Sequence, residues 1–138
     1  MNHQISTRCL NNDDYLPSVI KGMMGRMEFV MGGRMHSLML ATGILTPVLG
    51  ICFEQKIRSF GEVIGQEEYF VEADGLFEVD YLLSVIDLLW SNREKIRRTL
   101  ESNMKRLRQT AESNVLLLGN LLKISGIKIP KDFLPEAS

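Results

Sequence analysis

The fold of this chain is constrained most strongly by two short, mostly apolar runs, which lie on either side of a stretch of helix-forming residues. The runs are Glu28–Met31, followed by two glycines, and Val48–Phe53, and the residues between them, Arg34–Leu45, favour a helix. A third apolar run, Tyr69–Val71, follows a short amphipathic stretch, Lys56–Ile64. Apolar strands that alternate with helices are typical of a parallel sheet with helices on both faces. We therefore predict an α/β fold of the Rossmann-like kind.

The last part of the chain is predicted to be helical throughout. Phe77–Trp90 is apolar on most of its circumference, so we expect this helix to be largely buried. Arg93–Leu122 has apolar residues at spacings of three or four, which predicts a second, long helix with one apolar stripe. The 138 residues suit a single domain. We place its α/β part at residues 1–75 and its helical extension at residues 76–138.

Charge and cysteine content narrow the classes of function. The 16 basic and 17 acidic residues give a net charge of -1, without the basic excess of a nucleic-acid-binding domain. Cys9 and Cys52 are far apart and have no nearby His, which favours reduced thiols over a metal site, although one disulfide also fits. The sequence shows neither a membrane-spanning run nor a secretion signal, so we expect a cytoplasmic protein with at most peripheral membrane contact.

The junction after the first apolar run predicts an anion site. In residues 32–36 (GGRMH) a strand ends, two glycines allow a sharp turn and a helix begins at once. The first-turn N–H groups of a helix lack partners within it and lie at the positive end of its dipole. Lys56 follows the next strand, and parallel strands end at the same edge of the sheet. We predict that Arg34, His36 and Lys56 surround one anion; the alternative is that they are ordinary surface residues.

The same region carries an ordered set of motifs. These are Arg34-Met35-His36, the strand start Thr46-Pro47-Val48, and a short element, Phe53–Lys56, that ends in a lysine. Over about residues 14–72 the chain resembles the polysaccharide pyruvyl transferase family, which has Arg-Leu-His, a Pro-Val strand and Tyr-Asp-x-Lys in this order. Met in place of Leu conserves bulk, whereas Phe in place of Tyr removes a hydroxyl that could contact the substrate.

The resemblance implies a fold, a reaction and a role for each residue. The chain would be the C-terminal half of a glycosyltransferase-B-type architecture, without the family's N-terminal domain and therefore inactive alone. The reaction would transfer pyruvyl from phosphoenolpyruvate to a sugar or lipid-linked saccharide as a ketal. Arg34 and backbone N–H groups around Met35 would bind a donor anion, Lys56 would neutralise phosphate, and His36 would bind phosphate or act as general acid. The resemblance implies no metal and no cofactor beyond this donor substrate.

Two other functions fit the same sequence. One is half of a nucleotide-sugar glycosyltransferase, which would hold a diphosphate in the same crevice, with Glu54 as a candidate partner for a ribose. The other is a non-catalytic module whose helical end binds another protein. The apolar stripe of the long helix also suits a homodimer. Its basic residues between Arg93 and Arg108 would either contact phosphate-rich partners or lipid headgroups, or form a solvated face.

Overall fold

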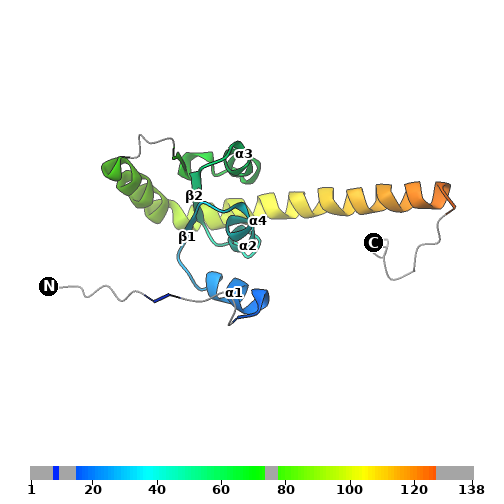
Figure 1. Cartoon of the computed structure of the whole chain (residues 1–138), viewed down its shortest axis with the longest axis horizontal. Coiled ribbons are helices and arrows are strands. Elements are labelled where there is room, and N and C mark those ends of the chain that lie inside the picture. The colour runs from blue at the N-terminus through cyan, green and yellow to red at the C-terminus, as the bar shows by residue number, and fades with distance from the viewer. Residues whose placement is uncertain (1–7, 10–14, 74–77, 127–138) are drawn as a thin grey trace.

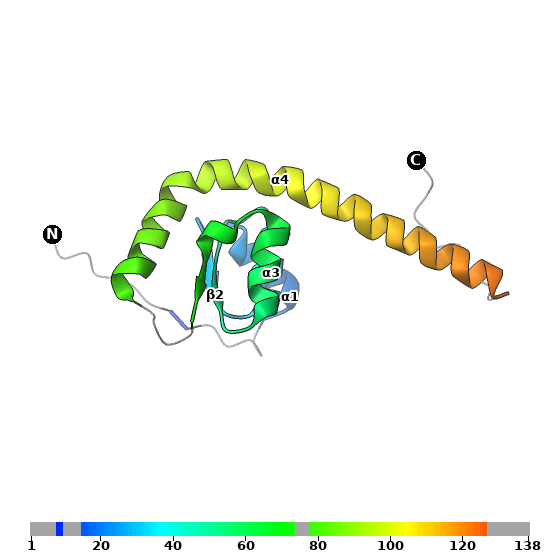
Figure 2. The same ribbon diagram turned by 90° about the horizontal axis from the view of Figure 1, so that it is seen from above.

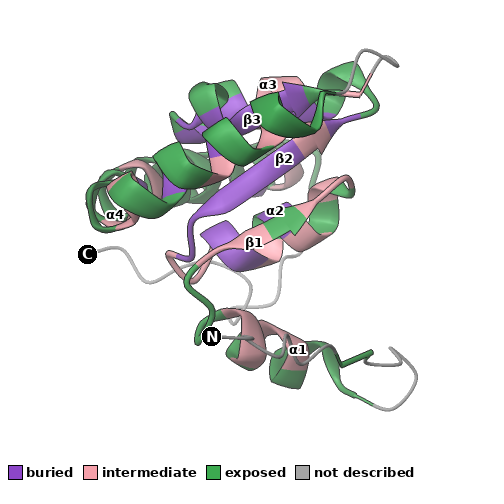
Figure 3. Cartoon of the chain, turned by 90° about the vertical axis from the view of Figure 1, so that its left-hand side faces the viewer, coloured by how far each residue is buried: buried purple, intermediate pink, exposed green. Residues whose placement is uncertain are grey.

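A three-stranded parallel sheet lies at the centre of the computed structural model, which describes residues 8–9, 15–73 and 78–126. The strands are β1 (Val30–Gly32), β2 (Val48–Cys52) and β3 (Phe70–Glu72), and they lie in this order, with β2 in the middle (Figures 1 and 3). Val30 is paired with Val48, and Gly50 with Phe70. The predicted α/β fold is confirmed to this extent, although the strand ends differ from the prediction by one or two residues.

One short helix precedes the first strand, and two more connect the strands. They are α1 (Pro17–Met24), α2 (Met35–Thr42) and α3 (Gln55–Ile64), and a 3-10 turn, η2 (Glu67–Tyr69), leads into β3. Figure 2 shows α3 on one side of the sheet and the first turns of the last helix, α4 (Val79–Ile124), on the other. The expected layers of helices on both faces are therefore present.

The helix α2 ends three residues before the predicted boundary at Leu45. Its last carbonyl groups are taken up by the turn that follows: the Thr46 N–H donates to the Ala41 carbonyl at 3.0 Å and the Leu45 N–H to the Thr42 carbonyl at 2.9 Å. Leu45 has a φ of 66°, a left-handed conformation that ends a helix. Propensity alone did not reveal this end, because leucine rarely adopts that conformation.

The core is concentrated on β2 and on the helix faces that point toward it (Figure 3). Val48 and Leu49 are fully buried, as expected for a central strand covered on both faces. The ring of Phe70 fills the space between β2 and α3. A Cβ atom at Gly50 would lie 2.3 Å from this ring and one at Gly61 would lie 2.8 Å from it. Both glycines therefore provide the space that a buried aromatic side chain needs.

The two predicted C-terminal helices are one continuous helix, α4. The residues between them include no proline or glycine to interrupt the helix, so it continues and its axis bends around the sheet (Figure 2). The expectation that Phe77–Trp90 is largely buried was wrong. Among the described residues of this stretch, 78–90, only Val85 and Leu89 are buried, whereas Tyr81 is 55% exposed and Trp90 47% exposed. A sheet of three short strands covers one face of this helix and leaves the others in solvent.

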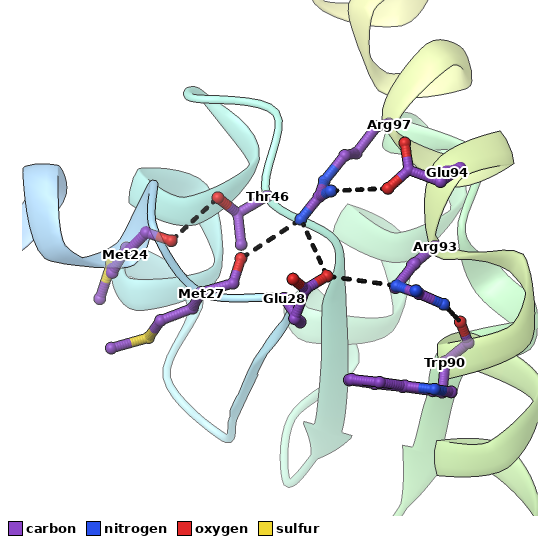
Figure 4. Close-up of polar contacts among 8 residues, drawn as sticks. All are labelled: Met24, Met27, Glu28, Thr46, Trp90, Arg93, Glu94 and Arg97. Carbon is purple, nitrogen blue, oxygen red and sulfur yellow. Dashed lines mark hydrogen bonds and ion pairs between the residues drawn. The ribbon is translucent and has the colours of Figure 1, made fainter.

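Arginine side chains attach α4 to the loop before β1 (Figure 4). Arg93 and Arg97 both donate to the Glu28 carboxylate, at 3.2 and 3.4 Å, and Arg97 also donates to the Met27 carbonyl. The guanidinium of Arg93 lies 4.5 Å from the centre of the Trp90 ring, a distance suited to a cation–π contact. Part of the predicted basic face is therefore engaged within the molecule.

Among the described residues, no helix is both long and apolar enough to cross a membrane.

Candidate functional site

A pocket of about 450 Å³ lies at the carboxyl ends of β1 and β2. The first turns of α2 and α3 and the residues just before them form its walls. The lining residues are Gly33, Arg34, Met35, His36, Glu54, Lys56 and Ile57. All four residues that the sequence assigned to substrate or catalysis are among them. The parallel strands bring the β1–α2 and β2–α3 junctions to the same edge of the sheet. The roles of the side chains in binding a ligand stay predictions.

The start of α2 contributes unpaired backbone donors to the pocket. Arg34 is the N-cap residue, with extended φ and ψ of -115° and 122°, and its carbonyl accepts the Ser37 hydroxyl at 2.7 Å. Within the described part of the chain, no side chain caps this helix. The N–H groups of its first residues are therefore left for water or a ligand, at the positive end of the helix dipole.

The start of α3 has the same arrangement. Glu54 is its N-cap residue in an extended conformation, yet its carboxylate makes no capping hydrogen bond to the helix. The carboxylate instead lies 2.7 Å from the Lys56 ammonium. Two helix N-termini and three basic or imidazole side chains thus meet at one pocket, which is a suitable environment for an anion.

Glu54 is the charged residue of the pocket that was not part of the predicted anion-binding cluster. Its carboxylate neutralises part of the charge of Lys56, so the pocket is not uniformly positive. Both side chains are more than half exposed, at 60% and 57%, and water and salt weaken such a pair. An incoming anion therefore has to compete with a weakly held carboxylate for Lys56. The signal in the sequence was the placement of Glu54 two residues before Lys56, at the predicted strand end.

The two glycines at the end of β1, Gly32 and Gly33, have a different role from the predicted one. Neither Gly32 nor Gly33 adopts a positive φ, so the turn does not depend on the conformational freedom of glycine. Gly33 instead provides space, because a Cβ atom there would lie 2.5 Å from the Phe53 ring. Phe53 is itself 68% exposed and covers the backbone beside Arg34. An exposed aromatic ring thus lies next to the pocket, in the position where the resembling family has tyrosine.

Cys52 lies beside the pocket but is poorly suited to act as a nucleophile. It lines a smaller hollow of about 210 Å³ together with Glu72, at the ends of β2 and β3. Burial raises the pKa of the Cys52 thiol, and the nearby Glu72 carboxylate raises it further. The neutral thiol is therefore favoured over the reactive thiolate. Cys52 is buried and free, and Cys9 is exposed and free, as the sequence predicted for reduced thiols.

A larger hollow of about 560 Å³ lies away from these residues, between the end of α2 and the middle of α4. Its charged lining is mixed, with Lys105 and Arg108 beside Glu101 and Glu112. Four charges of balanced sign favour no particular ligand. The pocket at the carboxyl ends of the strands is therefore the candidate site.

Comparison of the chain with protein-family models, curated proteins and solved structures found no match. Any family assignment therefore depends on the motifs between Arg34 and Lys56 and on the pocket that they form.

Proposed function

We propose that this chain is the donor-binding domain of a polysaccharide pyruvyl transferase and that it binds phosphoenolpyruvate in the pocket between α2 and α3. One observation carries the proposal. Arg34 and His36 from one strand–helix junction and Lys56 from the next line a single pocket, beside two uncapped helix starts. The family motifs at these positions support the same function.

The charges of the donor correspond to the groups in this pocket. Phosphoenolpyruvate carries a carboxylate and a phosphate, and a guanidinium such as that of Arg34 binds either with two parallel hydrogen bonds. The N–H groups at the start of α2 supply further donors. Lys56 is assigned to the phosphate, for which it has to leave the Glu54 carboxylate. The pocket would then hold both anionic groups of one small molecule.

The reaction needs a proton donor near the methylene carbon. In the proposed sequence His36 protonates this carbon, and a sugar hydroxyl adds to the adjacent carbon as positive charge develops there. Phosphate leaves, and a second hydroxyl of the same sugar closes the ketal. Two hydroxyl protons are released: one replaces the proton that His36 delivered, and the other leaves with the phosphate. Imidazole suits this role because its ordinary pKa is near neutrality.

The architecture of the resembling family adds a second half to the site. In a glycosyltransferase-B-type arrangement, another Rossmann-like domain would face this pocket and hold the sugar or lipid-linked acceptor. The chain by itself would bind the donor without transferring pyruvyl. Use of phosphoenolpyruvate, a metabolite of the cytoplasm, agrees with the predicted cytoplasmic location.

Calorimetric titration of the chain with phosphoenolpyruvate and with UDP-sugars tests the proposal. We expect saturable binding of phosphoenolpyruvate and a loss of roughly 10- to 100-fold in Arg34→Ala, since a hydrogen bond to a charged group contributes about 1.5–3 kcal/mol. Arg26→Ala is the matched control, because Arg26 is also exposed but does not line the pocket.

Three results would contradict the proposal. Preferential binding of UDP-sugars would favour the nucleotide-sugar glycosyltransferase, in which the Glu54 carboxylate accepts hydrogen bonds from ribose hydroxyls. Binding of neither ligand, or equal binding by the Arg34→Ala variant, would favour a non-catalytic module.

A further inference from the structure

The end of α4, beyond the residues that line the hollow beside α2, extends away from the sheet and from the other helices (Figures 1 and 2). We call its last ten residues, Val115–Ile124, the aliphatic tip. Six large apolar side chains in the tip are between 42% and 84% exposed. They are Val115, Leu116, Leu117, Leu118, Leu121 and Ile124. Such a concentration of exposed apolar side chains indicates a surface that is covered by a partner.

The apolar residues of the tip surround the helix instead of forming a stripe. Val115 to Leu118 are consecutive, and successive residues of a helix are about 100° apart, so these four side chains point in every direction around the axis. A helix that packs on one neighbouring helix needs one apolar face only. Lipid, by contrast, contacts an inserted segment on all sides. The distribution therefore favours an apolar medium over a single packed helix.

The charge around the tip complements an anionic surface. The sequence from Lys105 to Lys131 contains six basic residues and one acidic residue, Glu112, although the whole chain has a net charge of -1. The basic residues are Lys105, Arg106, Arg108, Lys123, Lys128 and Lys131. Two copies of this segment would repel one another if they paired side by side. Anionic lipid headgroups would attract it.

We propose that the projecting end of α4 binds an anionic membrane surface. The aliphatic tip enters the boundary between headgroups and acyl chains, and Lys105, Arg106 and Arg108 lie at the level of the headgroups. These three residues precede Val115 by seven to ten positions, or about 10–15 Å along a helix. All three side chains are exposed, and Lys105 and Arg108 stand at the hollow between α4 and the end of α2. Long basic side chains of this kind extend toward headgroups while their stems lie on apolar surface. This inference does not depend on the proposed donor or on the pocket.

Co-sedimentation of the full chain with lipid vesicles tests this inference. We expect binding to vesicles of phosphatidylcholine that contain phosphatidylglycerol, no binding to phosphatidylcholine alone, and weaker binding at high salt. The double variant Leu117→Glu, Leu118→Glu should lose binding. Replacing Lys105, Arg106 and Arg108 with Gln should weaken partitioning by roughly 100-fold, because each basic residue near such a surface contributes about fivefold.

A matched control distinguishes loss of the tip from a general effect of added charge. Val63→Glu places the same kind of substitution on α3, at a side chain that is 47% exposed. This variant should bind like the unaltered chain, and circular dichroism should show equal helix content in all variants. Failure of the unaltered chain to bind the anionic vesicles overturns the inference. Unchanged binding of the double variant also overturns it. The inference is likewise overturned if sedimentation shows that the chain forms a dimer and that this dimer does not bind vesicles.

Discussion

The ammonium of Lys56 lies 2.7 Å from the Glu54 carboxylate, and both side chains line the pocket at the carboxyl ends of the strands. The pair spans only two positions of the chain, at the very start of α3. The Glu54 carboxylate thus pairs with a side chain that is proposed to bind phosphate, and an anion has to displace it. Glu54 therefore sets how readily an anion gains access to Lys56.

Glu54→Gln should tighten phosphoenolpyruvate binding by up to about fivefold, since an exposed ion pair contributes about 0.2–1 kcal/mol. Calorimetric titration measures the change. Glu62→Gln on the exposed face of the same helix is the control for loss of one negative charge. Weaker binding by Glu54→Gln than by the unaltered chain would show that Glu54 contacts the ligand directly.

Gly50→Ala should destabilise the fold by about 1–3 kcal/mol, the usual cost of forcing an extra carbon into a packed core. The added Cβ would lie 2.3 Å from the Phe70 ring, which is 4% exposed and has little room to move. Urea denaturation gives the free energy of unfolding. Gly22→Ala in α1 is the contrasting variant, because its Cβ meets none of the described atoms within 4 Å. It should stabilise the chain by roughly 0.5–1 kcal/mol through helix propensity.

Tyr69 should make the fold less stable at high pH. Burial, followed by the Glu68 carboxylate, raises the pKa of Tyr69 to about 12 from an ordinary value of 10.0. The folded chain holds this proton more tightly than the unfolded chain, so its stabilising effect is complete below pH 10 and is lost as the pH rises toward 12. Urea denaturation of Tyr69→Phe should show a smaller decline across this range. An equal decline in both chains would assign the effect to other groups.

The contact between Glu28 and Arg93 should couple α4 to the loop before β1. A double-mutant cycle of Glu28→Ala and Arg93→Ala should yield an interaction energy of up to about 1 kcal/mol, because the Arg93 side chain is 31% exposed and the Glu28 side chain 52% exposed. The energy should decrease in high salt. Arg98→Ala is a suitable control, since Arg98 is an exposed arginine on the same helix. A coupling of zero at low salt would mean that apolar packing of Val85 and Leu89 attaches α4 without this ion pair.

Much of the candidate site follows from local sequence. An apolar strand followed directly by a helix places Arg34 and His36 at a strand end, and the same pattern places Lys56 at the next one. Parallel pairing then brings both ends to one edge. The contribution of Glu54 was harder to predict, because its carboxylate turns toward Lys56 instead of capping its own helix. The role of Gly33 depended on where the Phe53 ring packs.

The sequence by itself determined the α/β pattern, the parallel strands and the junctions from which the pocket is built, because apolar runs and helix starts are local signals. Only the tertiary structure decided how much of α4 is covered. Leu83 and Leu88 are as apolar as their buried neighbours Val85 and Leu89, but the sheet is too narrow to reach them. Burial depends on the surface that a neighbouring element offers, and that surface comes from parts of the chain distant in sequence.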